Sequence, residues 1–156
     1  MTLRPTANQR SDLTGGGSVF ARAPPVDLIV TSTLTRAIET AFLGFGAAAA
    51  AGAPPYVATE LCRERVADYT CDGRRPLSTL RAAFPGVDFS EVEAEEDAMW
   101  LHKEVADGEA SCRRRALRFV EWLLGRPERT IAVVSHSHFL LHLMALFPPA
   151  ALHGPS

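Results

Sequence analysis

The chain has 156 residues, of which 47% are hydrophobic, and its 16 basic and 18 acidic side chains give a formal net charge of −2. This composition is typical of one globular domain that buries a core, and the charge balance argues against nucleic acid or an acidic membrane surface as a partner. No apolar run approaches the roughly 20 residues of a membrane-spanning helix. The first ten residues lack the apolar core of a signal peptide, and the three cysteines lack metal-ligand spacing, so we expect a cytoplasmic protein with reduced thiols.

The amino-terminal third of the chain predicts an irregular segment followed by one strand and one helix. Residues 1–25 are polar and glycine-rich and end in two prolines, which favours a loop. Residues 26–31 are apolar and β-branched, typical of a strand, and residues 32–41 follow as a helix with a hydroxyl side chain at its start. Arg36 lies in the first turn of that helix, where a cation opposes the helix dipole. Its position indicates either an anion-binding residue or an ordinary surface arginine.

The middle of the chain carries a dense run of charged residues between positions 63 and 75. A short strand over 56–59 is predicted before this run, and a short helix over 77–84 after it. Such a charged segment is usually a hydrated surface loop. A carboxylate among arginines can alternatively bind a phosphate group and transfer a proton, and both interpretations are open at this point. The acidic stretch over 91–97 is expected to be a loop or an exposed turn.

The last third of the chain predicts a helix over 108–125, a strand over 130–134 and a second helix over 139–147. Arginines 113–115 fall on the polar side of the first helix, where we expect them to be solvated rather than to bind nucleic acid. The continuous Ile/Val run of the strand favours burial on both faces within a parallel sheet. His136 then lies at the carboxyl end of that strand, at the edge where open α/β sheets bind their ligands.

The histidines near the end of the chain suggest two kinds of chemistry. His136 can accept or donate a proton, or hold an anion, because imidazole titrates near neutral pH. His138 and His142 have the i, i+4 spacing that suits zinc on a helix. No carboxylate or cysteine lies near them in the sequence, and the helix is otherwise apolar, so we expect no metal site.

Two stretches of the sequence together resemble the histidine phosphatase superfamily, also called phosphoglycerate mutase-like proteins. Residues 30–41, Val-Thr-Ser-Thr-Leu-Thr-Arg-Ala-Ile-Glu-Thr-Ala, resemble that family's strand followed by Ser-Pro-Leu-x-Arg-Ala-x-x-Thr-Ala. Residues 133–140, Val-Val-Ser-His-Ser-His-Phe-Leu, resemble its late Val-Val-Ser/Thr-His-Gly/Ser-x-x-Leu. Between them, four segments resemble the plant and algal phosphoglycerate mutase-like branch, over residues 60–65, 71–75, 84–89 and 96–100.

This resemblance implies an α/β fold of three layers, with a mostly parallel sheet flanked by helices, over residues 26–147, and a short tail over 148–156. It implies a phosphorylated small molecule as substrate or ligand and no cofactor. Carried over residue by residue, Arg36 corresponds to a phosphate clamp, His136 to the second histidine of the phosphate pocket, and Glu64 to the general acid. Glu60 is the weaker candidate for that acid. Two further arginines are expected to contact the substrate, namely Arg74 and Arg75.

One departure from the family bears directly on activity. The family transfers phosphate to a histidine in an Arg-His-Gly motif on its first strand, and no such motif occurs here, where the first histidine is His102. We therefore expect the chain to lack the family's first strand, most of its first helix and its last strand. The sequence predicts a phosphatase or mutase-like protein that is inactive or impaired as it stands. Two alternatives are a non-catalytic module that binds a phosphorylated ligand and a destabilised fragment with exposed sheet edges.

Overall fold

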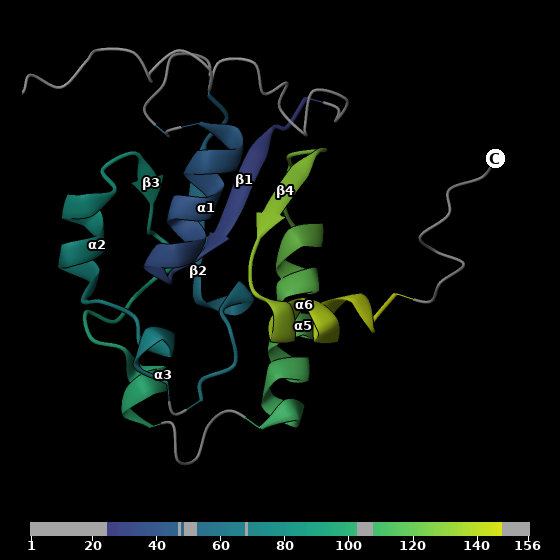
Figure 1. Ribbon diagram of the computed structural model, residues 1–156. Coiled ribbons are helices and arrows are strands. Elements are labelled where there is room, and N and C mark those ends of the chain that lie inside the picture. The colour runs from purple at the N-terminus through teal and green to yellow at the C-terminus, as the bar shows by residue number, and fades with distance from the viewer. Residues whose placement is uncertain (1–24, 47, 49–52, 68, 103–107, 148–156) are drawn as a thin grey trace, which may run out of the picture.

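The computed structural model describes residues 25–46, 48, 53–67, 69–102 and 108–147. The predicted irregular segment over 1–25 lies outside these ranges apart from residue 25, and the predicted tail over 148–156 lies outside them entirely. None of the helices in the described ranges combines the length and the apolar character that a membrane span requires. The elements follow one another as β1 (Leu28–Ser32), α1 (Thr35–Phe45), β2 (Tyr56–Thr59), η1 (Glu60–Cys62), η2 (Thr70–Asp72), α2 (Leu77–Ala83), β3 (Val87–Asp88), α3 (Ala98–Leu101), α5 (Glu109–Leu124), β4 (Ile131–Val134) and α6 (Ser137–Met144) (Figure 1).

The four strands form one sheet in the order β3-β2-β1-β4, and every pair in it is parallel. Val30 in the middle of β1 is opposite Val57 of β2 on one side and Val133 of β4 on the other. Parallel strands require long crossover connections, and here helices supply them. The carboxyl ends of β1, β2 and β4 consequently lie along one edge of the sheet, where the loops that follow them gather (Figure 1).

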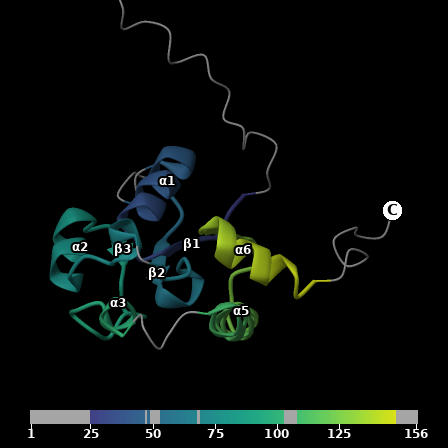
Figure 2. The same cartoon turned by 60° about the horizontal axis from the view of Figure 1, so that its bottom comes forward.

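Helices cover the sheet on both faces and complete the predicted three layers. Alternate residues of β1 face opposite ways, so that Ile29 packs into a core with α1 and α2, whereas Leu28 and Val30 pack into a second core with α5 and α6. Figure 2 shows α1 and α5 on opposite sides of the sheet. This arrangement confirms the predicted parallel α/β fold.

Each core is organised around aromatic side chains. In the first, Phe42 of α1 makes edge-to-face contacts with Tyr56, at 5.2 Å between ring centroids, and with Phe84, at 5.7 Å. In the second, Phe119 of α5 is fully buried and contacts Phe139 of α6 edge to face at 5.6 Å. Such pairs favour one mutual orientation of the helices, because the rings carry complementary edges and faces.

The last strand packs against a core on both faces, as predicted, but it is not fully buried. All four residues of β4 are partly exposed. The reason is their place in the sheet: within the described residues β4 pairs only with β1, so its other edge has no neighbouring strand. In β1 and β2, which each pair on both sides, every residue is buried.

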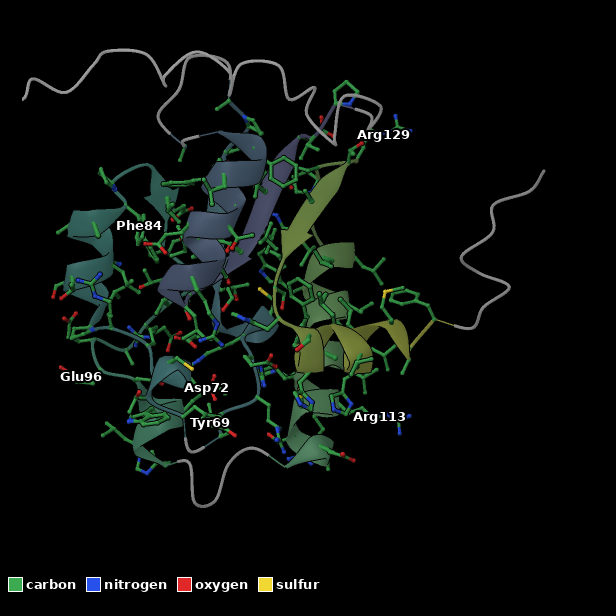
Figure 3. All side chains as sticks on the ribbon, in the orientation of Figure 1. Tyr69, Asp72, Phe84, Glu96, Arg113 and Arg129 are labelled. Atoms are coloured by element: carbon green, nitrogen blue, oxygen red, sulfur yellow. The ribbon has the colours of Figure 1, made fainter. Side chains whose placement is uncertain are left out.

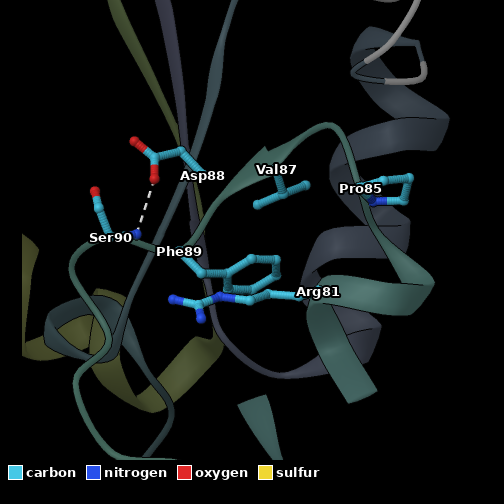
Figure 4. A pocket seen from close by; sticks show the side chains of 6 residues that line it. All are labelled: Arg81, Pro85, Val87, Asp88, Phe89 and Ser90. Atoms are coloured by element: carbon cyan, nitrogen blue, oxygen red, sulfur yellow. Dashed lines mark hydrogen bonds between the residues drawn. The ribbon is translucent and has the colours of Figure 1, made fainter. Parts of the chain in front are cut away.

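Several short elements were not predicted, among them β3 and α3. β3 has only two residues and pairs with β2, and α3 is a single turn whose start is capped by the Asp97 carboxylate, which accepts the Trp100 N–H at 3.0 Å. A side-chain cap of the same kind closes the turn after β3, where Asp88 accepts the Ser90 N–H at 2.8 Å beside a shallow cavity (Figure 4). Such elements are too short to show periodicity, so local capping and tertiary contacts define them.

Candidate functional site

The sheet brings two of the predicted site residues to the same edge. Thr31 of β1 is opposite Val134 of β4, so the residues that follow these two strands emerge side by side. Arg36 lies in the first turn of α1 after β1, and His136 lies between β4 and α6. Ser135 fixes the end of β4, because its hydroxyl donates a hydrogen bond to the Cys62 carbonyl at 2.6 Å.

His136 is the most distinctive group at this edge. The residue is only 8% exposed, and within the described part of the chain its Nε2 atom is buried without a hydrogen-bond partner. Burial first, and then the positive charge of Arg36, lower the pKa of His136 to about 4, although the negative charge of Glu64 acts in the opposite direction. At neutral pH the imidazole is therefore uncharged, and its Nε2 is free to bind an incoming group.

Arg36 is held in place by two residues of η2. Its guanidinium donates hydrogen bonds to the Cys71 carbonyl and, at 3.1 Å, to the carboxylate of Asp72. Asp72 is buried, and its second carboxylate oxygen accepts the Ala67 N–H at 3.3 Å, so it is itself anchored. Asp72 lies beyond the carboxyl ends of the strands (Figure 3). The Arg36 side chain is 40% exposed, which leaves part of its guanidinium accessible to a ligand.

Glu64 lies against the start of α6. Its carboxylate accepts backbone N–H groups from His138, at 3.4 Å, and from Phe139, at 3.2 Å. These are N–H groups of the first turn, which have no partner within the helix and which attract anions. Glu64 therefore lies next to His136, as predicted for a residue of the same site, and in this structure its carboxylate caps the helix. Its role as a general acid stays a prediction.

The structure places Arg74 in a different environment from Arg36 and His136. The residue is 7% exposed, and its guanidinium donates to the carbonyls of Ala94 at 2.8 Å and Glu96 at 2.8 Å. Its Nε lies 2.6 Å from a carboxylate oxygen of Glu60. These contacts hold the acidic segment after α2 in place, and they occupy the donors that were expected to contact a substrate. Arg75, by contrast, is exposed.

Arg63 is a structural residue that the sequence did not reveal. Its side chain is fully buried and forms a two-pronged contact with Asp97, with Nη1 2.6 Å from Oδ1. Nη1 also lies 3.0 Å from Glu60, and Nη2 donates to the Asp72 carbonyl at 2.6 Å. Burial alone would raise the pKa of Asp97, but hydrogen bonds from Arg63 and from the Arg74 N–H hold that pKa below its ordinary value. The expected surface loop is thus built on a buried ion pair.

The arginine run of α5 is not uniformly solvated, contrary to the prediction. Arg115 is half-buried, and its guanidinium donates to the Arg63 carbonyl and lies 5.5 Å from the centre of the Phe139 ring. Arg115 is three residues after Cys112 and four before Phe119, which are both buried, so it lies beside the apolar stripe of the helix. This spacing was the one sign in the sequence that Arg115 would be partly buried. Arg113 and Arg114 are exposed, as expected.

No group of three or more potential metal ligands occurs within the ranges that the structure describes. His138 is exposed, and His142 is partly buried further along α6. The features of this edge that could hold a ligand are instead one accessible guanidinium, one neutral imidazole and the N–H groups at the start of α6, two of which the Glu64 carboxylate occupies in this structure. Such a set is suited to an anion with several oxygen acceptors.

Comparison with known proteins connects this geometry to a family. The family model "Histidine phosphatase superfamily (branch 1)" matches residues 17–154. Among curated proteins, "Phosphoglycerate mutase-like protein" of Arabidopsis thaliana is 33% identical over 146 residues, covering 78% of this chain and 54% of that protein. "Phosphoglycerate mutase-like protein 1" of the same plant is 32% identical over 143 residues, covering 76% of this chain and 50% of the relative. No solved structure matched.

The chain spans about half the length of the curated relatives that it matches. The match nevertheless extends over most of the described fold, including the strand–helix units that carry Arg36 and His136. The resemblance inferred from the two motifs is therefore confirmed, and the chain belongs to the histidine phosphatase superfamily.

Proposed function

We propose that this chain binds the phosphate group of a phosphomonoester at the edge formed by Arg36, His136 and the start of α6. The observation that supports the proposal most strongly is the buried, unpaired Nε2 of His136, which follows the strand next to the one that leads to Arg36. A buried polar atom without a partner costs free energy, and a phosphate oxygen would supply the missing partner. The family membership of the chain points to the same ligand.

The chemistry of phosphate binding fits these groups. A guanidinium offers two parallel N–H donors to phosphate oxygens, and Asp72 orients that of Arg36. A dianionic phosphate next to His136 would favour the imidazolium and so raise its pKa from about 4. Binding would then take up a proton, and the site would hold the anion with two cations. Phosphoryl transfer mostly requires this kind of charge neutralisation.

Turnover needs more than a binding pocket. The covalent route of the family requires the histidine of an Arg-His-Gly motif, and the printed sequence contains none. His138 is a poor substitute, because it is exposed and lies in the first turn of α6 rather than at the end of a strand. The proposal is accordingly a phosphate-binding member of the family whose catalysis is absent or impaired in these 156 residues. A cytoplasmic location and the lack of a nucleic-acid partner stay predictions.

The proposal is tested by two measurements on the purified chain and its variants. Titration calorimetry with orthophosphate is expected to show one site that is lost in Arg36→Ala and in His136→Ala and kept in His138→Ala. Hydrolysis of p-nitrophenyl phosphate is expected to be no faster than in buffer. Orthophosphate binding that is unchanged in both Arg36→Ala and His136→Ala would refute the site. Hydrolysis that disappears in His136→Ala would refute the argument about the missing nucleophile.

A further inference from the structure

A further cavity lies between η1, α3 and α5, and neither Arg36 nor His136 is among the residues that line it. Four of its lining residues come from one stripe of that helix, at spacings of three and four residues, namely Ser111, Arg114, Arg115 and Arg118. Leu61 of η1 and Met99 of α3 form its apolar wall. The cavity measures about 490 Å³, which is within the usual size range of small-molecule sites.

The charge of this cavity is strongly positive. Among the described residues that line it, the one carboxylate belongs to Glu60, whose two oxygens already contact Arg63 at 3.0 Å and Arg74 at 2.6 Å. Within the described ranges neither Arg114 nor Arg118 has an ion-pair partner. Arg118 also borders a neighbouring cavity that contains several glutamates, but none of them comes within ion-pair distance of it.

The arrangement of the arginines is unfavourable for the helix itself. Arg114 and Arg118 stand four residues apart on one face, where like charges repel each other. Both side chains are exposed, so they contribute no core packing that would offset this repulsion. Arg113 does not line the cavity, and it projects from the side of α5 that faces away from α3 (Figure 3). An anion in the cavity would convert the repulsion into attraction.

We propose that this cavity binds a small molecule that carries two or more phosphate or carboxylate groups, at a site separate from Arg36 and His136. The guanidinium groups of Arg114 and Arg118 bind the anionic oxygens from one side, and the Ser111 hydroxyl donates or accepts a further hydrogen bond. Arg115 forms the inner wall. Since Arg115 also hydrogen-bonds to the carbonyl of Arg63 in the loop beside Glu64, a ligand here contacts the segment that borders the first site.

The experiment measures pyrophosphate binding by calorimetry at physiological ionic strength, which screens weak surface attraction. The background is the double variant Arg36→Ala/His136→Ala, so that only the second site is observed, and its folding is checked by circular dichroism. In this background we add Arg114→Ala/Arg118→Ala, and separately Arg113→Ala as the matched control that does not line the cavity. If the background variant does not fold, the wild-type chain saturated with orthophosphate replaces it.

The expected result is that pyrophosphate binds the background protein, that Arg114→Ala/Arg118→Ala weakens this binding by at least about tenfold, and that Arg113→Ala changes it less than about twofold. If the background protein does not bind pyrophosphate while the wild-type chain does, the second site is refuted and the first stands. Equal weakening by Arg113→Ala and by the Arg114 and Arg118 changes would show diffuse attraction to the helix and would also refute it. A wild-type chain that binds neither anion refutes both proposals.

Discussion

The buried imidazole of His136 makes a specific prediction about the stability of the fold at acidic pH. The residue is 8% exposed, and its pKa is lowered to about 4, first by burial and then by the charge of Arg36. In the unfolded chain the same side chain recovers an ordinary pKa of about 6.5. Between these two values the unfolded chain binds a proton that the folded chain does not.

The sign and the size of the effect follow from that difference. Because the unfolded state binds more protons, the free energy of unfolding falls as the pH is lowered from about 6.5 towards about 4. The contribution of the neutral His136 to that free energy is fully present only above this pH range. A separation of about 2.5 pH units corresponds to about 3 kcal/mol when the group is fully titrated. That is a large part of the free energy of unfolding of a typical domain, which is roughly 5–15 kcal/mol.

Urea unfolding of the wild-type chain, His136→Gln and His138→Gln over a series of pH values tests this prediction. We expect the wild-type and His138→Gln proteins to lose stability in parallel between about pH 6.5 and about pH 4, because the His138 side chain is exposed. His136→Gln should lose about 3 kcal/mol less over the same range, since its side chain does not titrate. Carboxylates with lowered pKa values contribute equally to all three proteins and cancel in the comparison. Identical slopes in wild-type and His136→Gln would refute the buried neutral imidazole.

Three further changes test the surroundings of the site. Arg63→Met leaves the buried Asp97 carboxylate without its arginine partner. We expect urea titrations to show a free energy of unfolding lower by about 3–5 kcal/mol, and a loss below about 1 kcal/mol would contradict the buried ion pair. Asp72→Asn removes the charge that orients the guanidinium of Arg36 and should weaken orthophosphate binding by up to about tenfold in calorimetry, with unchanged affinity as the contrary result. Glu64→Ala removes the carboxylate from the start of α6, so we expect the free energy of unfolding to fall by about 1 kcal/mol and orthophosphate to bind more tightly. Glu64→Gln keeps an acceptor oxygen and should keep most of that stability. Weaker orthophosphate binding in Glu64→Ala would contradict a competition between the carboxylate and the anion.

The elements that place the site could be predicted because their sequences follow simple periods. The apolar run that ends at Thr31 and the one that ends at Val134 predicted two strands, and each is followed by a helix. Strands joined by helices tend to be parallel, and parallel strands end at one edge. For that reason Arg36 and His136, one hundred residues apart in the sequence, follow neighbouring strands at one edge of the sheet, whereas the family resemblance supplied the expectation that they share a site, which stays a prediction.

The charged segment between residues 63 and 75 could not be predicted in the same way. Arg63 and Asp97 are 34 residues apart, and neither sequence context shows an apolar pattern that would signal burial. The usual expectation for charged residues is exposure, and it fails only when a distant partner satisfies the group. The exposure of β4 was misjudged for a related reason, because a strand's own sequence does not tell whether it lies at the centre or at the edge of the sheet.

These buried contacts explain how a segment with little regular structure can hold a cation at the site. Asp97 fixes the guanidinium of Arg63, and Arg63 in turn donates a hydrogen bond to the carbonyl of Asp72. The Asp72 side chain then holds Arg36 at 3.1 Å. Phosphate binding depends on donors that are already in place, since ordering them during binding reduces affinity. The sequence motif points to Arg36 as the arginine proposed to face the ligand, whereas the orientation of its guanidinium depends on two acidic residues that lie outside the motif.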